Sequence, residues 1–322
     1  MKVTVHFVHL LALAAALALP AQAQNYPAKP VRVIVPYAAG GNTDFVMRQI
    51  GAKLSPVFGQ QVIVDNRPGG GTNIGSELVV KAPPDGYLLL MAGAANAINM
   101  TLFANPPYQT LRDLTPIVLC TTGANVLTAH PSVPARDLKQ LIALAKARPG
   151  KLNFASSGIG SSNQMAGELL KVMAGINIVH VPYKGNTPAM SDAIAGHVEL
   201  LFSGVTAPVP HIKSGRLRAI AIGSLKRFPA IPEVPTFDES GLKGYEALTW
   251  FGLMGPAKTP RDIVMRWNTE VGKVLASAEI QERFANDGQV PAGGTPEQFG
   301  SFIRAEIDKY AKVIKKAGVP QQ

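Results

Sequence analysis

Residues 36–44, Pro-Tyr-Ala-Ala-Gly-Gly-Asn-Thr-Asp, combine small residues with hydroxyl and amide groups in a pattern suited to binding an anion. The stretch follows an apolar segment at residues 31–35 and precedes Val46, Ile50 and Leu54, which are apolar at helical spacing. Such a turn directs free backbone N–H groups and the positive end of a helix at one place. The sequence therefore indicates a candidate anion site here.

Two interpretations of this first loop stay open. In one, Gly40 and Gly41 let the backbone approach a ligand, and Tyr37 supplies a wall or its hydroxyl. In the other, the loop is a plain turn capped by a polar residue after the glycines. Asp44 is assigned to the helix, because an acid in the first turn stabilises a helix and would repel an anion. The candidate contacts are Tyr37, Ala39, Gly40, Gly41, Asn42 and Thr43.

A second loop, residues 156–164, mirrors the first: a strand-like segment, then small residues and hydroxyls, then a helical pattern. Hydroxyl and N–H groups at a helix start can hold a carboxylate without an opposing charge. A single capping serine would explain one hydroxyl of this serine loop but not four, which favours ligand contact. The candidate contacts are Ser157, Gly160, Ser161 and Ser162.

Three further loops follow strand-like segments. Residues 66–75 contain three consecutive glycines but lack both the Gly-Lys-Ser/Thr ending of a phosphate loop and the G-x-G-x-x-G spacing. That loop is interpreted as a flexible turn leading to a helix that begins near Asn73. Lys184 is either a counter-charge for a ligand or a solvated lysine. Phe202, which precedes Ser203, is either a core residue or part of the cleft mouth, and both are taken as candidate contacts.

No catalytic or metal-binding pattern stands out. Ser157 lacks the G-x-S-x-G setting of a hydrolase nucleophile, although a triad assembled in space stays open as a secreted-hydrolase alternative. The histidines are scattered without metal-ligand spacing, and Cys120, the only cysteine, lies in an apolar run typical of a buried thiol. We therefore expect a binding protein with no enzymatic activity, no cofactor and no metal.

The elements that position these loops alternate between strand-like and helical patterns, which indicates an α/β architecture with parallel strands. The predicted strands are residues 31–35, 62–64, 87–92, 152–155, 178–181, 199–202 and 217–222.

Two longer strand-like segments, residues 116–129 and 245–254, are predicted to cross between two lobes. The first lobe would then comprise residues 24–125 and 249–322, and the second residues 126–248. Helical stripes in the C-terminal part are expected to pack onto the first lobe. A ligand would bind in the cleft between the lobes.

The N-terminus has the form of a secretory signal. A basic start, an apolar run and a small-x-small motif ending at Ala23 predict removal of residues 1–23 and export of the mature chain. Loss of Lys2 lowers the Lys and Arg count from 31 to 30 against 21 acids, a net charge of +9. These charges are scattered without basic runs, so we expect no nucleic-acid partner, whereas anionic small molecules fit the balance.

With these loops identified, the chain resembles the Bug family, also called TctC-type solute receptors of tripartite tricarboxylate transport. The resemblance covers nearly the whole mature chain. It rests on Tyr26-Pro27-Ala28-Lys29-Pro30, Pro36-Tyr37-x-x-Gly40-Gly41-x-x-Asp44, Asn66-Arg67-Pro68-Gly69, Pro84-Asp85-Gly86-Tyr87, Ser156-Ser157-Gly158-x-Gly160-Ser161, Val181-Pro182-Tyr183-Lys184-Gly185, Pro232-Glu233-Val234-Pro235-Thr236 and Gly255-Pro256-Ala257.

The resemblance implies a periplasmic binding protein type II fold, with two α/β lobes joined by two crossing strands that close on a small carboxylate. It implies that the first loop and the serine loop hold the carboxylate, partly through water. A wall from residues 93–99 would add Ala94 and Asn96 as contacts. It also implies a membrane transporter as partner, or a signalling protein in orphan receptors that act as sensors. The receptor is expected to be a monomer.

The chain departs from the family pattern at two places. Gln164 stands where many relatives carry a histidine, and Gly93-Ala94-Ala95-Asn96-Ala97 replaces a loop that commonly has serine and threonine or histidine character. Both changes remove polar groups from the expected cleft. They bear on which carboxylate binds rather than on the class of ligand.

Overall fold

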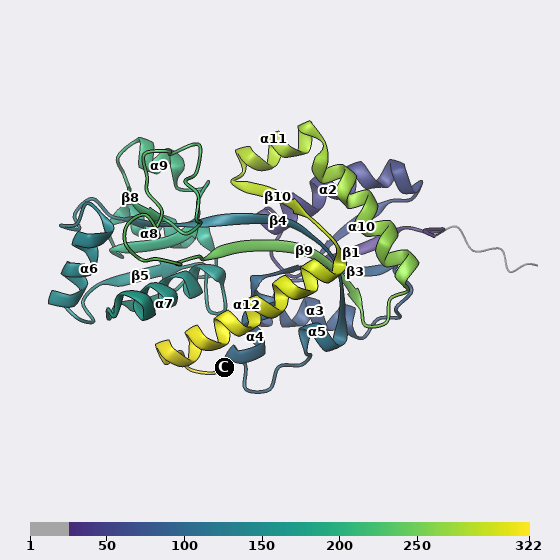
Figure 1. Cartoon of the computed structure of the whole chain (residues 1–322), viewed down its shortest axis with the longest axis horizontal. Helices are drawn as coiled ribbons and strands as arrows, with labels where there is room; N and C mark the ends of the chain where they lie inside the picture. The colour runs from purple at the N-terminus through teal and green to yellow at the C-terminus, as the bar shows by residue number, and fades with distance from the viewer. Residues whose placement is uncertain (1–25) are drawn as a thin grey trace, which may run out of the picture.

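The computed structural model describes residues 26–322, and the predicted signal peptide lies outside the described residues. Within that range, no helix is both long and apolar enough to cross a membrane. The chain forms one mixed sheet in the order β2-β1-β3-β9-β4-β7-β5-β6, with β8 and β10 also paired to β4. Figure 1 shows two groups of elements at the ends of an elongated molecule, the two lobes of this fold.

The first lobe is built on three parallel strands with β1 between the other two. Their apolar residues explain the arrangement, since Val31, Val33 and Val35 are fully buried. β1 and β2 are each followed by a loop and then a helix, whereas α4 begins directly after β3. The elements are β1 (Val31–Val35), α2 (Asn42–Phe58), β2 (Val62–Asn66), the short 3₁₀ helix η1 (Gly70–Thr72), α3 (Asn73–Val80), β3 (Leu88–Gly93), α4 (Ala94–Leu102) and α5 (Thr110–Asp113).

The second lobe repeats the scheme, because β5 lies between β6 and β7 and runs parallel to both. The strands again run into helices through short polar loops. The elements are α6 (Leu138–Ala147), β5 (Asn153–Ser156), α7 (Ser162–Ala174), β6 (Val179–Pro182), α8 (Asn186–Ala195), β7 (Leu200–Gly204), α9 (Val209–Lys213) and β8 (Arg218–Ile222).

Two long antiparallel strands, β4 (Leu114–Ala129) and β9 (Leu248–Pro256), join the lobes. β9 pairs with β3 of the first lobe, and the far half of β4 pairs with β7 and β8 of the second. Figure 1 shows both running along the length of the molecule. The predicted crossing segments therefore form these strands, and antiparallel pairing at the centre makes the sheet mixed.

The C-terminal elements correct one expectation. They are α10 (Arg261–Ala276), α11 (Ala278–Asn286), β10 (Gln289–Gly293) and α12 (Pro296–Ala317). α10 packs on the first lobe as expected, but α12 packs against both α4 and α7 and thus bridges the lobes. The reason lies in its apolar stripe, which is longer than one lobe: Phe299 lies in a cluster with Trp250, and Val313 lies in the core of the second lobe.

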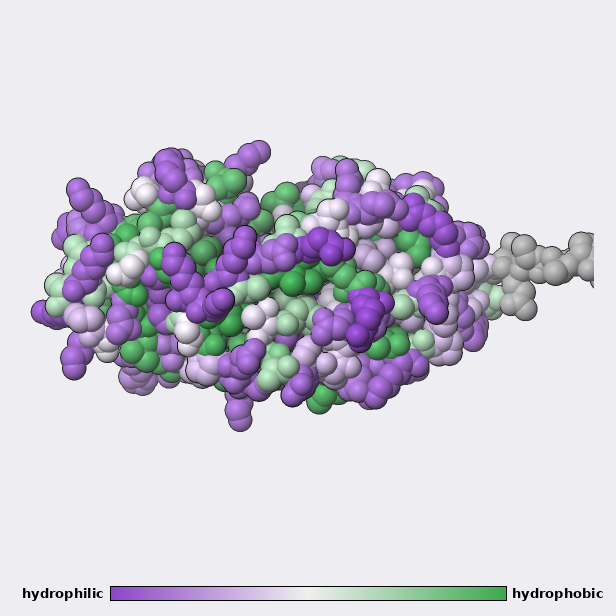
Figure 2. All heavy atoms as spheres, turned by 60° about the horizontal axis from the view of Figure 1, so that its bottom comes forward, coloured by the Kyte–Doolittle hydropathy of each residue, from purple (hydrophilic) through white to green (hydrophobic). Residues whose placement is uncertain are grey.

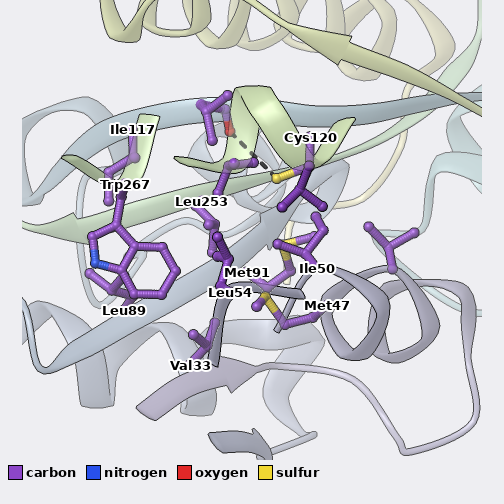
Figure 3. Close-up of a cluster of buried hydrophobic side chains, with 14 of the residues drawn as sticks. Val33, Met47, Ile50, Leu54, Leu89, Met91, Ile117, Cys120, Leu253 and Trp267 are labelled. Carbon is purple, nitrogen blue, oxygen red and sulfur yellow. Dashed lines mark hydrogen bonds between the residues drawn. The ribbon is translucent and has the colours of Figure 1, made fainter. Parts of the chain in front are cut away.

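Each lobe has its own core. In the first, Met47, Trp267 and Cys120 belong to one apolar cluster, and burial raises the pKa of the Cys120 thiol to about 12 (Figure 3). In the second, aromatic rings dominate: Phe202 stacks on Phe237, which in turn stacks on Tyr245. The outer face on the side of α4 and α12 is largely hydrophilic, with apolar residues in separate patches (Figure 2).

Candidate ligand-binding site

A cavity of about 660 Å³ lies between the two lobes. It forms where the carboxyl ends of β1, β2 and β3 face those of β5, β6 and β7, so the loops after these strands line it. β9 closes its inner end with Thr249, Trp250 and Phe251. The crevice beyond the carboxyl ends of parallel strands is the usual ligand site of α/β sheets.

All the predicted contacts of the first loop and of the serine loop line this cavity. Ala94 and Lys184 join them. The structure thus brings together segments from opposite lobes that are more than a hundred residues apart in the sequence. The predicted contacts that line the cavity are Tyr37, Ala39, Gly40, Gly41, Asn42, Thr43, Ala94, Ser157, Gly160, Ser161, Ser162 and Lys184.

The first loop is shaped by Asp44, which points away from the ligand space. Its Oδ2 accepts hydrogen bonds from the Gly40 backbone N–H at 3.0 Å and from Arg48 Nε at 2.9 Å. Burial opposes ionisation of this carboxyl, but the bonds from Arg48 and Gly40 outweigh it and lower the pKa. Asp44 therefore stays ionised and fixes the loop.

The start of α2 is left without a side-chain cap. The helix begins at Asn42, and its N-cap is Gly41, which has no side chain to offer. The alternative of a turn capped by Asn42 or Thr43 does not describe this helix. The backbone N–H groups of the first turn are thus available to an anion in the cavity.

A glycine at the end of β3 lets three segments meet behind the first loop. A Cβ on Gly93 would lie 2.9 Å from the Tyr37 hydroxyl and 3.3 Å from the Trp250 carbonyl oxygen. Burial raises the pKa of Tyr37, so its hydroxyl stays protonated. The Tyr37 ring therefore rests as a fixed wall against the inner end of the cavity.

The serine loop uses most of its hydroxyl donors internally. Ser161 Oγ donates to the Gly158 carbonyl at 2.6 Å and caps α7 by accepting from the Gln164 N–H. Ser157 Oγ donates to Asn163 Oδ1 at 3.1 Å. Ser162 Oγ forms no hydrogen bond within the described chain, so its donor faces no competitor.

Gln164 has a clear structural role at the position where the family resemblance predicts a histidine. Its Oε1 accepts from the Gly160 N–H at 2.8 Å, and the residue is 4% exposed. This bond occupies one backbone donor of the loop. The first turn of α7, starting at Ser162, provides the donors that remain.

Three predicted contacts lie outside the cavity lining. Asn96 is fully buried and bonds to the Gly93 N–H, Ser76 and Tyr108, so it supports the start of α4 from behind. Phe202 is a core residue, which is the first of the two interpretations given for it. The Ser203 hydroxyl is fully buried and donates to the Gly204 carbonyl. Phe202 and Ser203 project from opposite faces of β7, whereas the cavity lies beyond the carboxyl end of the strand, where Gly204 lines it.

Sequence reasoning missed the glycine-rich loop after β2, which lines the cavity with Gly69, Gly71 and Thr72. Thr72 has a φ of 82°, a left-handed conformation that is strained for a β-branched residue. The missed signal is topological. This loop follows a parallel strand next to β1, so it opens on the same edge of the sheet as the first loop.

A serine and a histidine do meet near the site, but not in a catalytic arrangement. His180 Nε2 lies 2.6 Å from Ser156 Oγ. Ser156 is fully buried and does not line the cavity, and burial lowers the pKa of His180 to about 4. The pair supports the serine loop from below, because Ser156 Oγ also accepts the Gly158 N–H at 3.1 Å. Across residues 26–322, no cluster of side chains could hold a metal ion.

Two α/β lobes, two crossing strands and a polar cavity between them are the architecture of the periplasmic binding protein fold, which is found in a class of solute receptors. The chain belongs to the TctC family, described as the tripartite tricarboxylate transporter family receptor, which it matches over residues 46–319. Members of this family are solute-binding receptors, not enzymes.

Three relatives illustrate the family. Protein BugT of Bordetella pertussis is 37% identical over 306 residues, covering 94% of each chain. The structure of Rpa4515 of R. palustris with adipate has a TM-score of 0.83 and 35% identity, covering 91% of this chain and 98% of that one. MatC of Rhodopseudomonas palustris with bound malate has a TM-score of 0.80 and 29% identity, covering 90% and 100%.

Proposed function

We propose that this protein is a periplasmic receptor that binds a small carboxylate between its lobes and delivers it to a tripartite tricarboxylate-type transporter. One observation carries the proposal: the cavity is lined by the first turns of several helices and by no acidic side chain of the described chain. Lys184 is the single charged residue of that lining. Such a site attracts an anion and offers it donors without an opposing charge.

The helix starts provide the donors. Residues at the first turns of α2, α4, α7 and α8 all line the cavity, from both lobes. Each contributes unsatisfied N–H groups and the positive end of its dipole. A carboxylate placed between α2 and α7 would be held mainly by backbone, with the Ser162 hydroxyl beside it.

Closure of the lobes is the proposed mechanism of capture. The contacts belong to opposite lobes, which we place at residues 24–125 with 249–322 and at residues 126–248. β4 and β9 are the continuous connections about which the lobes would move. A ligand bound by both lobes stabilises the closed form by its differential affinity, and opening releases it.

The relatives support a carboxylate as ligand and a transporter as partner. Rpa4515 is described with adipate and MatC with malate, and the family description names the transporter. Delivery to such a transporter would be periplasmic, which fits the predicted signal peptide. We propose that the receptor works as a monomer.

Isothermal titration of the purified, ligand-free mature protein with carboxylates tests the proposal. The panel contains adipate, malate, succinate and hexanoate, with adipamide as a neutral control of matched shape. We expect binding of at least one carboxylate and none of adipamide, because the amide lacks the charge that the helix starts recognise. Failure of every carboxylate to bind would refute the proposed function.

A further inference from the structure

One edge of the crossing strand β4 is shared by strands of both lobes. β9 pairs with the other edge, and β7 of the second lobe and β10 of the first pair with this one. Gly204 at the end of β7 lies opposite Asn125. Gln289 at the start of β10 lies opposite Gly123, so the two strands end close together on β4. A bend of β4 at this point therefore changes the distance between the two strand ends.

Gly288, directly before β10, lies against the residues that follow β7. A Cβ placed on Gly288 would overlap the Thr206 hydroxyl oxygen and lie 3.0 Å from Val205 Cγ1. Val205 is 2% exposed, and its N–H donates to the Ala124 carbonyl at 3.0 Å, so it is held in place. Thr206 is β-branched, which restricts its rotamers. The two lobes therefore approach here to a distance that leaves no room for a side chain at position 288.

This contact is connected to the cavity wall in both lobes. On the side of the second lobe, Gly204 lies just before it and lines the cavity. On the side of the first lobe, Gly288 follows α11, whose Phe284 ring lies 6.1 Å from that of Phe45 on α2. α2 begins at Asn42, another lining residue, and a Cβ on Gly204 would lie 3.8 Å from Asn42 Nδ2. A wider gap at Gly288 therefore moves Gly204 away from Asn42 and widens the cavity.

We infer that Gly288 and Thr206 form a stop that sets how far the two lobes close. With only hydrogen at position 288, the end of β7 reaches the place from which Gly204 faces Asn42, and a side chain there would halt it earlier. The inference rests on the lobe closure of the proposed function. Neither Gly288 nor Thr206 lines the cavity, so the stop acts on closure and not on ligand contact.

The test has to separate this contact from backbone strain. Gly288 has a φ of 67°, in the left-handed region where any alanine is strained. Gly293 at the other end of β10 has a φ of 82°, but no atom lies within 4 Å of the position of its Cβ. Gly293→Ala thus carries the same kind of strain without the overlap and is the matched control.

The experiment combines isothermal titration with small-angle X-ray scattering of the ligand-free and ligand-saturated protein. The probes are adipate, malate, succinate and hexanoate. The variants are Gly288→Ala, the control Gly293→Ala, and Gly288→Ala combined with Thr206→Ala, which removes the overlapping oxygen. Thr206→Ile enlarges the same contact from the second lobe and leaves the glycine in place, so it tests the stop if Gly288→Ala does not fold. Thermal unfolding shows which variants are folded.

We expect the radius of gyration of the wild type to fall on saturation, and that of Gly288→Ala to fall less. Gly288→Ala should bind every probe about tenfold more weakly, because incomplete closure lowers the population of the form that both lobes contact. Addition of Thr206→Ala should restore most of both losses. Thr206→Ile should change both quantities in the direction of Gly288→Ala, and Gly293→Ala should change neither.

Wild-type affinity and contraction in Gly288→Ala would overturn the inference and leave the carboxylate receptor standing. The same conclusion would follow from an equal loss in Gly293→Ala, from a loss that Thr206→Ala does not restore, or from wild-type behaviour of Thr206→Ile. A wild type that binds a carboxylate without contracting would overturn both lobe closure and the stop. Absence of carboxylate binding by the wild type would overturn the proposed function, and the inference with it.

Discussion

The two loops that face each other across the cavity hold their shapes by different interactions. The first loop leaves the start of α2 uncapped and uses the carboxylate of Asp44, turned away from the ligand, to shape its backbone. The serine loop caps α7 with Ser161 and shapes itself with neutral groups. One loop is therefore set by a buried charge and the other by a network of hydroxyls and amides.

The comparison shows that a polar residue near an anion site need not touch the anion. Asp44 Oδ2, Ser157 Oγ and Ser161 Oγ each form a hydrogen bond with a neighbouring group of the protein. The groups that remain for the ligand include backbone N–H groups, the hydroxyl of Ser162 and the charge of Lys184. The loops should consequently respond differently to substitution and to pH.

The largest effect is expected from breaking the charged support of the first loop. Asp44→Ala removes the acceptor of the Gly40 N–H and leaves Arg48 without its partner, which should cost about 1.5–3 kcal/mol of folding free energy. Carboxylate affinity should fall with it, because the loop loses its fixed shape. Urea unfolding and isothermal titration measure the two effects. Wild-type values in both would show that Asp44 does not shape the loop.

The next largest effect should be a pH dependence of the folding stability that arises at the serine loop and not at the first loop. Burial lowers the pKa of His180 from 6.5 to about 4, so the unfolded chain binds the proton more readily than the folded one. The stability that neutral His180 supports is fully present above pH 6.5 and is lost as the pH falls from 6.5 towards 4. Unfolding temperatures of the wild type and His180→Gln across this range should converge at the acid end. Parallel curves would contradict the assignment.

The smallest effect concerns single hydroxyls of the serine loop. Ser162→Ala should weaken carboxylate binding by about 0.5–1.5 kcal/mol, because its donor is free. Ser161→Ala should instead cost about 1 kcal/mol of stability through loss of the α7 cap. Titration and urea unfolding of both variants separate the two losses. A larger binding loss for Ser161→Ala than for Ser162→Ala would reverse the roles given to these serines.

The fold was largely predictable because its signals are local. Alternating strand and helix patterns placed the parallel strands, and long apolar segments without helical spacing marked β4 and β9. Their antiparallel pairing and the course of α12 across both lobes depend on contacts distant in the sequence. The apolar stripe from Phe299 to Ile314 indicates that one face of α12 is buried, but it does not indicate which elements cover that face.

The site was predictable to the level of loops, not of atoms. Glycines and helix starts after strands identified the first loop and the serine loop. Phe202 and Ser203 were wrong because both lie within β7 and are buried on its two faces, and only Gly204 at the end of the strand reaches the cavity. Thr72 was not predicted to line the cavity, because no sequence pattern indicates a threonine with a positive φ. Which hydroxyls are already engaged, as at Ser157, emerges only from the folded loop.

In the lobe closure that we propose, the bridging course of α12 would affect how easily the receptor closes. α12 contacts α4 in one lobe and α7 in the other, so any relative motion of the lobes has to slide or bend one of these contacts. The Gln322 N–H donates to the Leu102 carbonyl at 2.8 Å, which ties the segment after α12 to the α4 side and leaves the α7 contact as the one to move. A substitution at the contact between α12 and α7 would change the free energy of closure and would leave the groups that contact the ligand unchanged. It would scale the affinity for every ligand by one common factor and keep their ranking intact.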